Sequence, residues 1–153
     1  IESEYSDNSN DVYLDFLKEK EGFRDTAYKP IDSEEYYTIG YGNYGQNVKE
    51  GDTITKEQAT AQLQGNIDTK LAEIRQAIPD FDSLPLEARK HLLGSWFRGS
   101  LSGSPKTISL LNDGRFEEAS KEFLNNNEYK TTSLGGVKKR MNNTSNAILG
   151  LIG

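Results

Sequence analysis

The chain has 153 residues, of which 34% are hydrophobic, so it is long enough for one compact domain with a buried core. Its formal net charge of −6 argues against nucleic-acid binding, for which a basic surface is the usual footprint. The absence of cysteine excludes disulfides and thiolate catalysis, and no apolar run approaches the roughly 20 residues that a membrane-spanning helix needs.

The chain begins with a polar segment that leads into an amphipathic pattern. Residues 1–10 are acidic and rich in Ser and Asn, which predicts a linker or a disordered N-terminus. Residues 11–21 predict a helix that ends at Glu21, because Gly22 is a natural stop. The negative end of the helix dipole disfavours a carboxylate there, which makes Glu21 a candidate proton donor. The competing interpretation is a surface glutamate in the charged run of residues 18–21.

Short strands are predicted next, over residues 26–29, 36–41 and 44–48. These segments contain β-prone aromatic residues, and glycines near the last two strands allow tight turns and close backbone approach. Thr38 lies inside the second predicted strand. Its hydroxyl group would therefore be held on a rigid element close to a glycine turn.

Helical patterns occupy the rest of the chain. Residues 55–78 predict one long helix, because apolar or small residues recur at steps of three and four. Thr55 and Gln58 have the spacing of a capping box at its start. Four shorter helices are predicted, over residues 84–98, 105–112, 115–125 and 137–150. Early strands followed by helices indicate the α+β class, with a small sheet lobe and a helical lobe.

One stretch of the chain combines several motifs. An acid–glycine pair ends the first helix, a Tyr-Lys step follows, and a threonine lies on a strand that glycines close. The residues are Glu21-Gly22, Tyr28-Lys29 and Tyr37-Thr38-Ile39-Gly40-Tyr41-Gly42. This combination resembles the phage-type lysozymes, the glycoside hydrolase family 24 muramidases that include the lysozyme of T-even phages. Individually weaker matches continue in the same order over roughly residues 11–150.

The resemblance implies a lysozyme-like α+β fold with a small β-sheet N-terminal lobe and a helical C-terminal lobe joined by a long helix. Residues 11–153 would form this single domain. Its parts would be an N-terminal lobe at 11–54, a connecting helix at 55–78 and a helical lobe at 79–153.

The resemblance also implies a muramidase, which hydrolyses the β-1,4 bond between N-acetylmuramic acid and N-acetylglucosamine in peptidoglycan. Cleavage of a glycosidic bond typically uses two carboxyl groups. By resemblance Glu21 would be the general acid. Asp32 would position or activate the attacking water, or stabilise the transition state, and the Thr38 hydroxyl would hold that water.

The position of the second acid is ambiguous. Counted forward from Glu21, the family's aspartate falls on Pro30; counted back from Thr38, it falls on Asp32. The chain is therefore expected to carry two extra residues in this turn, and Asp32 is the preferred assignment. Three other acids are rivals for the role: Asp25, Glu34 and Glu35.

A substrate cleft between the two lobes would be lined by aromatic faces and directional hydrogen bonds. Tyr44 follows the Gly-x-Gly strand, and Phe97 and Arg98 end the helix that aligns with cleft-lining positions of the family. Thr107, on the following helix, is a fainter candidate. Core packing of Phe97 and a plain surface role of Arg98 are the alternatives.

No cofactor and no metal are expected. The chain has one histidine, His91, and no Gly-x-Ser-x-Gly elbow, so neither a serine triad nor a histidine-based metal site is supported.

Peptidoglycan is the expected partner, in the bacterial periplasm or at the cell wall. A monomer without nucleic-acid or membrane-spanning contacts is expected for the isolated chain. The acidic surface lacks electrostatic steering toward an anionic wall, so delivery by phage tail or baseplate proteins competes with release from the host cytoplasm at lysis. From another class, a non-catalytic peptidoglycan-binding or tail-assembly module with the same fold stays open. A toxin domain is a third possibility.

Overall fold

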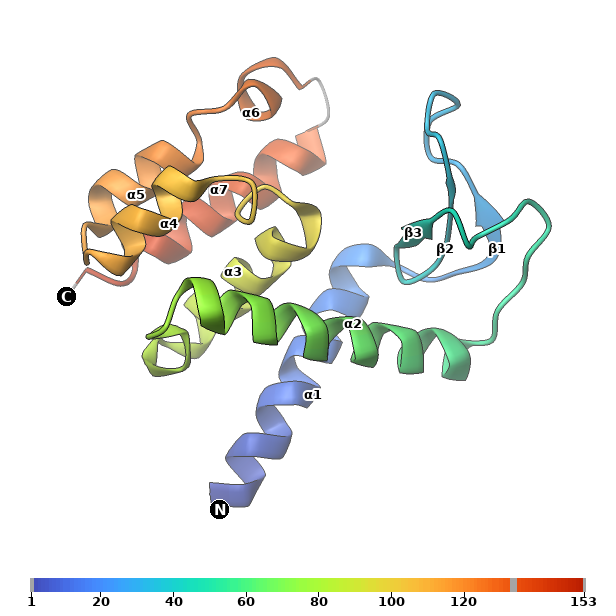
Figure 1. The fold of residues 1–153 in the computed structure, drawn as a ribbon, viewed down its shortest axis with the longest axis horizontal. Helices are drawn as coiled ribbons and strands as arrows, with labels where there is room; N and C mark the ends of the chain where they lie inside the picture. Colours follow the sequence, from blue (N-terminus) through green and yellow to red (C-terminus); the bar gives the residue numbers. More distant parts are fainter. Residues whose placement is uncertain (1, 133–134, 153) are drawn as a thin grey trace. The chain divides into compact units, whose positions relative to one another are not determined.

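The computed structural model describes residues 2–132 and 135–152. Residues 1, 133–134 and 153, which the sequence assigns to the N-terminal segment and the helical lobe, lie outside the described residues. The chain divides into two compact units, Ile1–Thr69 and Lys70–Gly153. The strands of the described part all belong to the first unit and the second unit is helical, which confirms the α+β class (Figure 1).

Helix α1 (Glu2–Glu21) opens the first unit. It begins at Glu2, so the prediction of a helix that starts at residue 11 was wrong about its start. Ser, Asn and Asp are only moderately poor helix formers, and residues 2–10 contain no Gly or Pro that would break a helix. Whether residues 1–10 also serve as a linker stays a prediction.

Three strands form an antiparallel sheet, with β2 (Tyr37–Gly40) between β1 (Arg24–Tyr28) and β3 (Asn43–Gly45). The pairing of β1 with β2 is irregular, because Arg24 lies opposite Gly40 while Tyr28 lies opposite Thr38. Four steps along β1 therefore oppose two steps along β2. The sequence predicted the strands but not this bulge.

The outer side of β1 is also paired. Thr26 forms an isolated bridge with Thr53, the Ala27 amide donates to the Asp52 carbonyl over 2.9 Å, and the Ile54 amide donates to the Asp25 carbonyl over 2.9 Å. The segment just before the long helix thus closes the edge of the sheet.

Helix α2 (Lys56–Ala77) confirms the predicted long helix. Its capping box is formed in both directions: the Gln58 amide donates to Thr55 Oγ1 over 3.1 Å, and the Thr55 amide donates to Gln58 Oε1 over 3.0 Å. Within the first unit, its first half buries Ala59, Leu63 and Ile67.

The second unit contains the end of α2 and the remaining helices: η1 (Phe81–Ser83), α3 (Leu86–Arg98), α4 (Pro105–Asn112), α5 (Phe116–Phe123), α6 (Asn127–Thr131) and α7 (Gly135–Leu149). Helix α7 packs against both α3 and α5, and α5 packs against α4. Buried hydroxyls join these helices, since Ser95 Oγ and Thr144 Oγ1 are 2.8 Å apart and Ser145 Oγ donates to the Ser120 carbonyl. Among the helices of the described part, none is both long and apolar enough to cross a membrane.

Candidate active site

Glu21 is the last residue of α1, as the sequence predicted. The Gly22 amide donates the final helical bond to the Lys18 carbonyl over 3.0 Å, and Gly22 itself has a φ of +70°, a left-handed conformation that favours glycine. The chain then turns directly into β1. This geometry fixes the backbone of Glu21 at the junction of helix and sheet, with its side chain half-buried.

The Glu21 carboxyl group lies against the turn that joins β2 to β3. The contact is made at Gly42, where an added Cβ atom would be 2.8 Å from Glu21 Oε1. Gly42 has a φ of +79°, so the turn and the close approach both require glycine. A helix end and a strand turn therefore meet at one carboxyl group.

Thr38 lies on the central strand and is buried, with 7% of its surface exposed. It is directly opposite Tyr28 on one side and Tyr44 on the other. Directly opposed residues of an antiparallel sheet share a face, so two tyrosines flank Thr38.

Tyr44 has an exposed ring, with 47% of its surface accessible. The ring packs against that of Tyr36 at a centroid distance of 5.6 Å and an interplanar angle of 57°. The Tyr44 hydroxyl oxygen also accepts a hydrogen bond from the Tyr36 amide over 3.3 Å. This pairing holds an aromatic surface beside the strand that carries Thr38.

Sequence reasoning did not assign roles to two residues of this sheet. The Arg24 guanidinium lies 4.0 Å from the centroid of the Tyr28 ring, an energetically favourable cation–π distance. Arg24 and Tyr28 are four residues apart on β1, whereas their partners Gly40 and Thr38 are only two residues apart on β2, so the pairing contains a bulge. The irregular register is what the sequence could not reveal.

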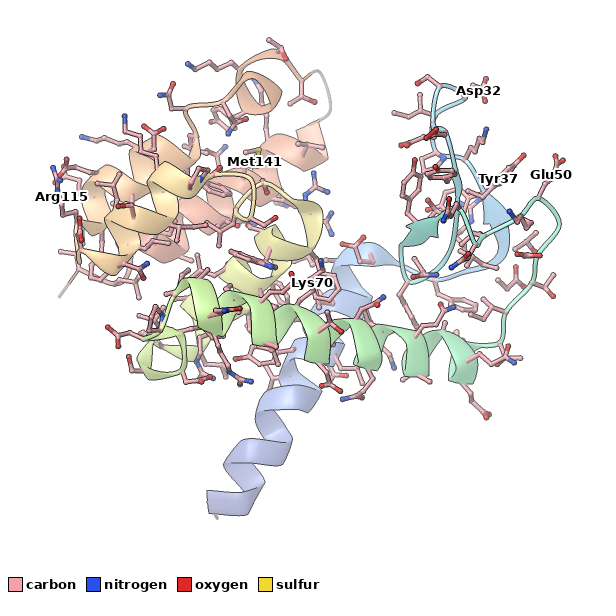
Figure 2. The ribbon with its side chains drawn as sticks, in the orientation of Figure 1. Asp32, Tyr37, Glu50, Lys70, Arg115 and Met141 are labelled. Carbon is pink, nitrogen blue, oxygen red and sulfur yellow. The ribbon has the colours of Figure 1, made fainter. Side chains whose placement is uncertain are left out.

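Asp32 lies on an exposed turn in the loop between β1 and β2. The Glu34 amide closes this turn by donating to the Ile31 carbonyl over 3.0 Å. Figure 2 shows Asp32 at the outer end of the loop, away from the strands.

The three rival acids lie on strand β1 and in the loop that carries Asp32. Asp25 is exposed on β1 and accepts a hydrogen bond from the Thr26 hydroxyl over 3.1 Å. Glu34 is half-buried and Glu35 is exposed, both in the loop that carries Asp32. The identity of the second acid remains a prediction.

Glu50, another acid of the first unit, affects the pKa of Tyr37. Burial raises the pKa of the Tyr37 hydroxyl, and the charge of Glu50 together with its hydrogen bond adds to this effect. Both residues are labelled in Figure 2. The shift of the pKa favours the protonated Tyr37 hydroxyl on the strand that carries Thr38.

The predicted substrate residues of the second unit differ in exposure. Phe97 is half-buried, and Arg98 is exposed as the last residue of α3. Thr107 is fully buried in α4, and its hydroxyl oxygen has no hydrogen-bond partner among the described residues. Their contacts with substrate remain predictions.

Trp96 is buried in α3, with 7% of its surface exposed. Its indole nitrogen donates a hydrogen bond to Glu73 Oε1 over 2.9 Å. This bond lowers the pKa of Glu73; burial opposes the shift, and the positive charge of Lys70 reinforces it. In the part of the chain that the structure describes, no cluster of three His, Asp or Glu side chains could hold a metal ion.

The chain is similar to known proteins in sequence and in fold. The family model described as phage lysozyme matches residues 18–144. An endolysin of Bacillus phage B103 is 32% identical over 139 residues, which cover 87% of this chain and 51% of that protein. An endolysin of Bacillus phage PZA is 32% identical over 116 residues, which cover 72% of this chain and 43% of that protein. The chain thus spans about half the length of the curated relatives it matches.

Among solved structures, the muramidase domain of SpmX from Asticaccaulis excentricus superposes with a TM-score of 0.69. The sequences are 21% identical, and the match covers 90% of this chain and 95% of that domain. This similarity confirms the lysozyme-like fold.

Proposed function

We propose that this chain, which belongs to the phage lysozyme family, hydrolyses the β-1,4 bond between N-acetylmuramic acid and N-acetylglucosamine in peptidoglycan. The observation that carries the proposal is the position of Glu21. Its carboxyl group lies at a helix end, half-buried, against the turn that follows the strand with Thr38. An acid held at the junction of two rigid elements can meet a glycosidic oxygen with fixed geometry.

In the proposed reaction Glu21 protonates the leaving oxygen while the bond to the anomeric carbon breaks. A water molecule attacks that carbon from the opposite face and loses its proton to a second carboxylate. The Thr38 hydroxyl forms a hydrogen bond with this water. Asp32 is the proposed second carboxylate. An inverting reaction of this kind needs carboxyl groups roughly 6.5–9.5 Å apart.

Sugar rings would be bound by the aromatic surface of Tyr44 and Tyr36, because rings of sugars and of aromatic side chains stack well in concave, preformed sites. Phe97, Arg98 and Thr107 are proposed as further contacts from the second unit. Two of the relatives are endolysins of Bacillus phages, so cell walls of Gram-positive bacteria are the proposed target. Action at the wall after release at lysis is proposed over attachment to a phage tail.

The test is the release of reducing sugar ends from purified peptidoglycan. Glu21→Gln removes the transferable proton but keeps the shape of the side chain, so the rate should fall by about 10²–10⁴-fold. The matched control is Glu19→Gln, which alters an exposed glutamate two positions earlier on the same helix. Full activity of Glu21→Gln, with folding unchanged, would refute the mechanism.

A second candidate function follows from the exposed position of Asp32. If its loop does not approach the sheet, the chain is a peptidoglycan-binding module without catalysis. In that case the wild type would sediment with insoluble peptidoglycan but release no reducing ends. Binding together with release supports the enzyme.

A further inference from the structure

We propose that Gly42 is the positioning residue for the Glu21 carboxyl group: the missing side chain at position 42 creates the space in which the acid is held. The catalytic consequence of this inference rests on the proposed function. The position of the carboxyl group itself is independent of the proposed function, because it follows from the contact at Gly42 alone.

The contact is close and comprises several atoms. A Cβ atom built on Gly42 would lie 2.8 Å from Glu21 Oε1, 3.5 Å from Cδ and 3.6 Å from Cγ. Real Cβ atoms essentially never approach another heavy atom closer than 3.0 Å. A side chain at position 42 and the observed position of the Glu21 carboxyl group therefore exclude each other.

Four other glycines with positive φ show that Gly42 does more than allow a left-handed backbone turn. Gly22, Gly51, Gly99 and Gly114 have φ between +70° and +89°, yet an added Cβ would meet nothing within 4 Å at any of them. These four positions need glycine for the backbone alone. At Gly42, glycine is needed for the backbone and also for a neighbouring carboxyl group.

The atoms that a Cβ would meet belong to the far end of a flexible side chain. The least costly response to a methyl group at position 42 is therefore rotation of Glu21, with the backbone of the turn unchanged. The fold would survive while the acid moved away from its place. Displacement of a reacting group by about 1 Å can cost about 10²-fold in rate.

The experiment compares Gly42→Ala with Gly51→Ala. Gly51 is exposed in the same unit with a φ of +89° and open space around it, so it carries the backbone strain without the contact. Both variants should lose roughly 2–8 °C in Tm. On purified peptidoglycan, kcat of Gly42→Ala should fall about 10–100-fold with KM within about twofold of wild type, because the aromatic surface is untouched. Gly51→Ala should keep both constants, and equal kcat values for the two variants would overturn the inference.

A second measurement does not depend on turnover. The NMR signal of the Glu21 side-chain carboxyl carbon should move in Gly42→Ala and stay in place in Gly51→Ala. An unmoved signal in Gly42→Ala overturns the inference even if the wild type is active. If the wild type releases no reducing ends but the signal moves, the proposed function fails and the positioning role stands.

Discussion

Thr107 carries a buried hydroxyl group that has no hydrogen-bond partner among the described residues. Burial of an unpaired hydroxyl is costly, so Thr107→Val should raise the free energy of unfolding by about 1–2 kcal/mol. Urea denaturation measures this change. The matched control is Thr144→Val, which should destabilise the protein, because the Thr144 hydroxyl is 2.8 Å from Ser95 Oγ and donates to the Arg140 carbonyl.

The same variant tests the predicted contact of Thr107 with substrate. If the Thr107 hydroxyl contacts substrate, Thr107→Val should also raise KM, whatever its effect on stability. Increased stability with unchanged KM would instead assign Thr107 to the interior of the helical unit.

Asp32 and Asp25 are both exposed, so neutral amides at either position should fold normally. If Asp32 is the second acid, Asp32→Asn should lower kcat by about 10²-fold or more, and Asp25→Asn should stay within about twofold of wild type. Reducing-end release from peptidoglycan measures both. The opposite order of effects would place the two-residue insertion elsewhere in the chain.

Trp96 is the single tryptophan of the chain, and it reports on Glu73 through their hydrogen bond. The pKa of Glu73 is lowered in the folded protein, so its carboxylate stabilises the fold above its ordinary pKa of 4.5. This contribution is lost as the pH falls through the lowered value. The midpoint of a tryptophan fluorescence titration should therefore lie below 4.5 in wild type and be absent in Glu73→Gln.

At the scale of elements, the capping box of α2 makes a direct contribution to stability. Thr55→Ala removes the acceptor for the Gln58 amide and should cost about 1 kcal/mol. The matched control is Thr69→Ala on the same helix, where the hydroxyl donates only to the Gly65 carbonyl and its loss should be near neutral. Thermal unfolding of the two variants gives the comparison, and equal effects would contradict the assigned role of the cap.

The elements that the sequence predicted well are those with local signals. The capping pair Thr55 and Gln58 marks the start of α2, and Gly22 marks the end of α1. Helix α6 and η1, with five and three residues, were missed because they are too short to show a hydrophobic period. The predicted start of α1 was wrong because helix propensity is a weak guide in a polar segment that contains no Gly or Pro.

In the candidate site, too, features with local sequence signals were predicted and tertiary contacts were not. The helix end at Glu21 and the strand at Thr38 follow from local pattern, since Gly22 and the Thr-Ile-Gly segment mark them in the sequence. The contact between Glu21 and Gly42 is tertiary, and so is the register that places Tyr28 and Tyr44 beside Thr38. The register between β1 and β2 is shifted by a bulge, which the sequence pattern did not reveal.

At the scale of the whole molecule, the net charge of −6 bears on the proposed action at an anionic cell wall. Like charges repel, and dissolved salt screens this repulsion over about 10 Å at 0.1 M. The kcat/KM on intact walls should therefore rise when ionic strength increases from about 10 mM to about 150 mM. Walls stripped of their anionic polymers provide the control and should show a weaker dependence. A fall of kcat/KM with salt would indicate a basic contact surface that the net charge conceals.

The closed outer edge of β1 has a consequence for association between molecules. An unpaired strand edge is a template on which another chain can add a strand, and such pairing leads to aggregation. Here residues 52–54 occupy that edge through the Thr26–Thr53 bridge, and β3 at the other edge is only three residues long. An aromatic-rich sheet can thus stay exposed at high protein concentration without recruiting strands from neighbouring copies.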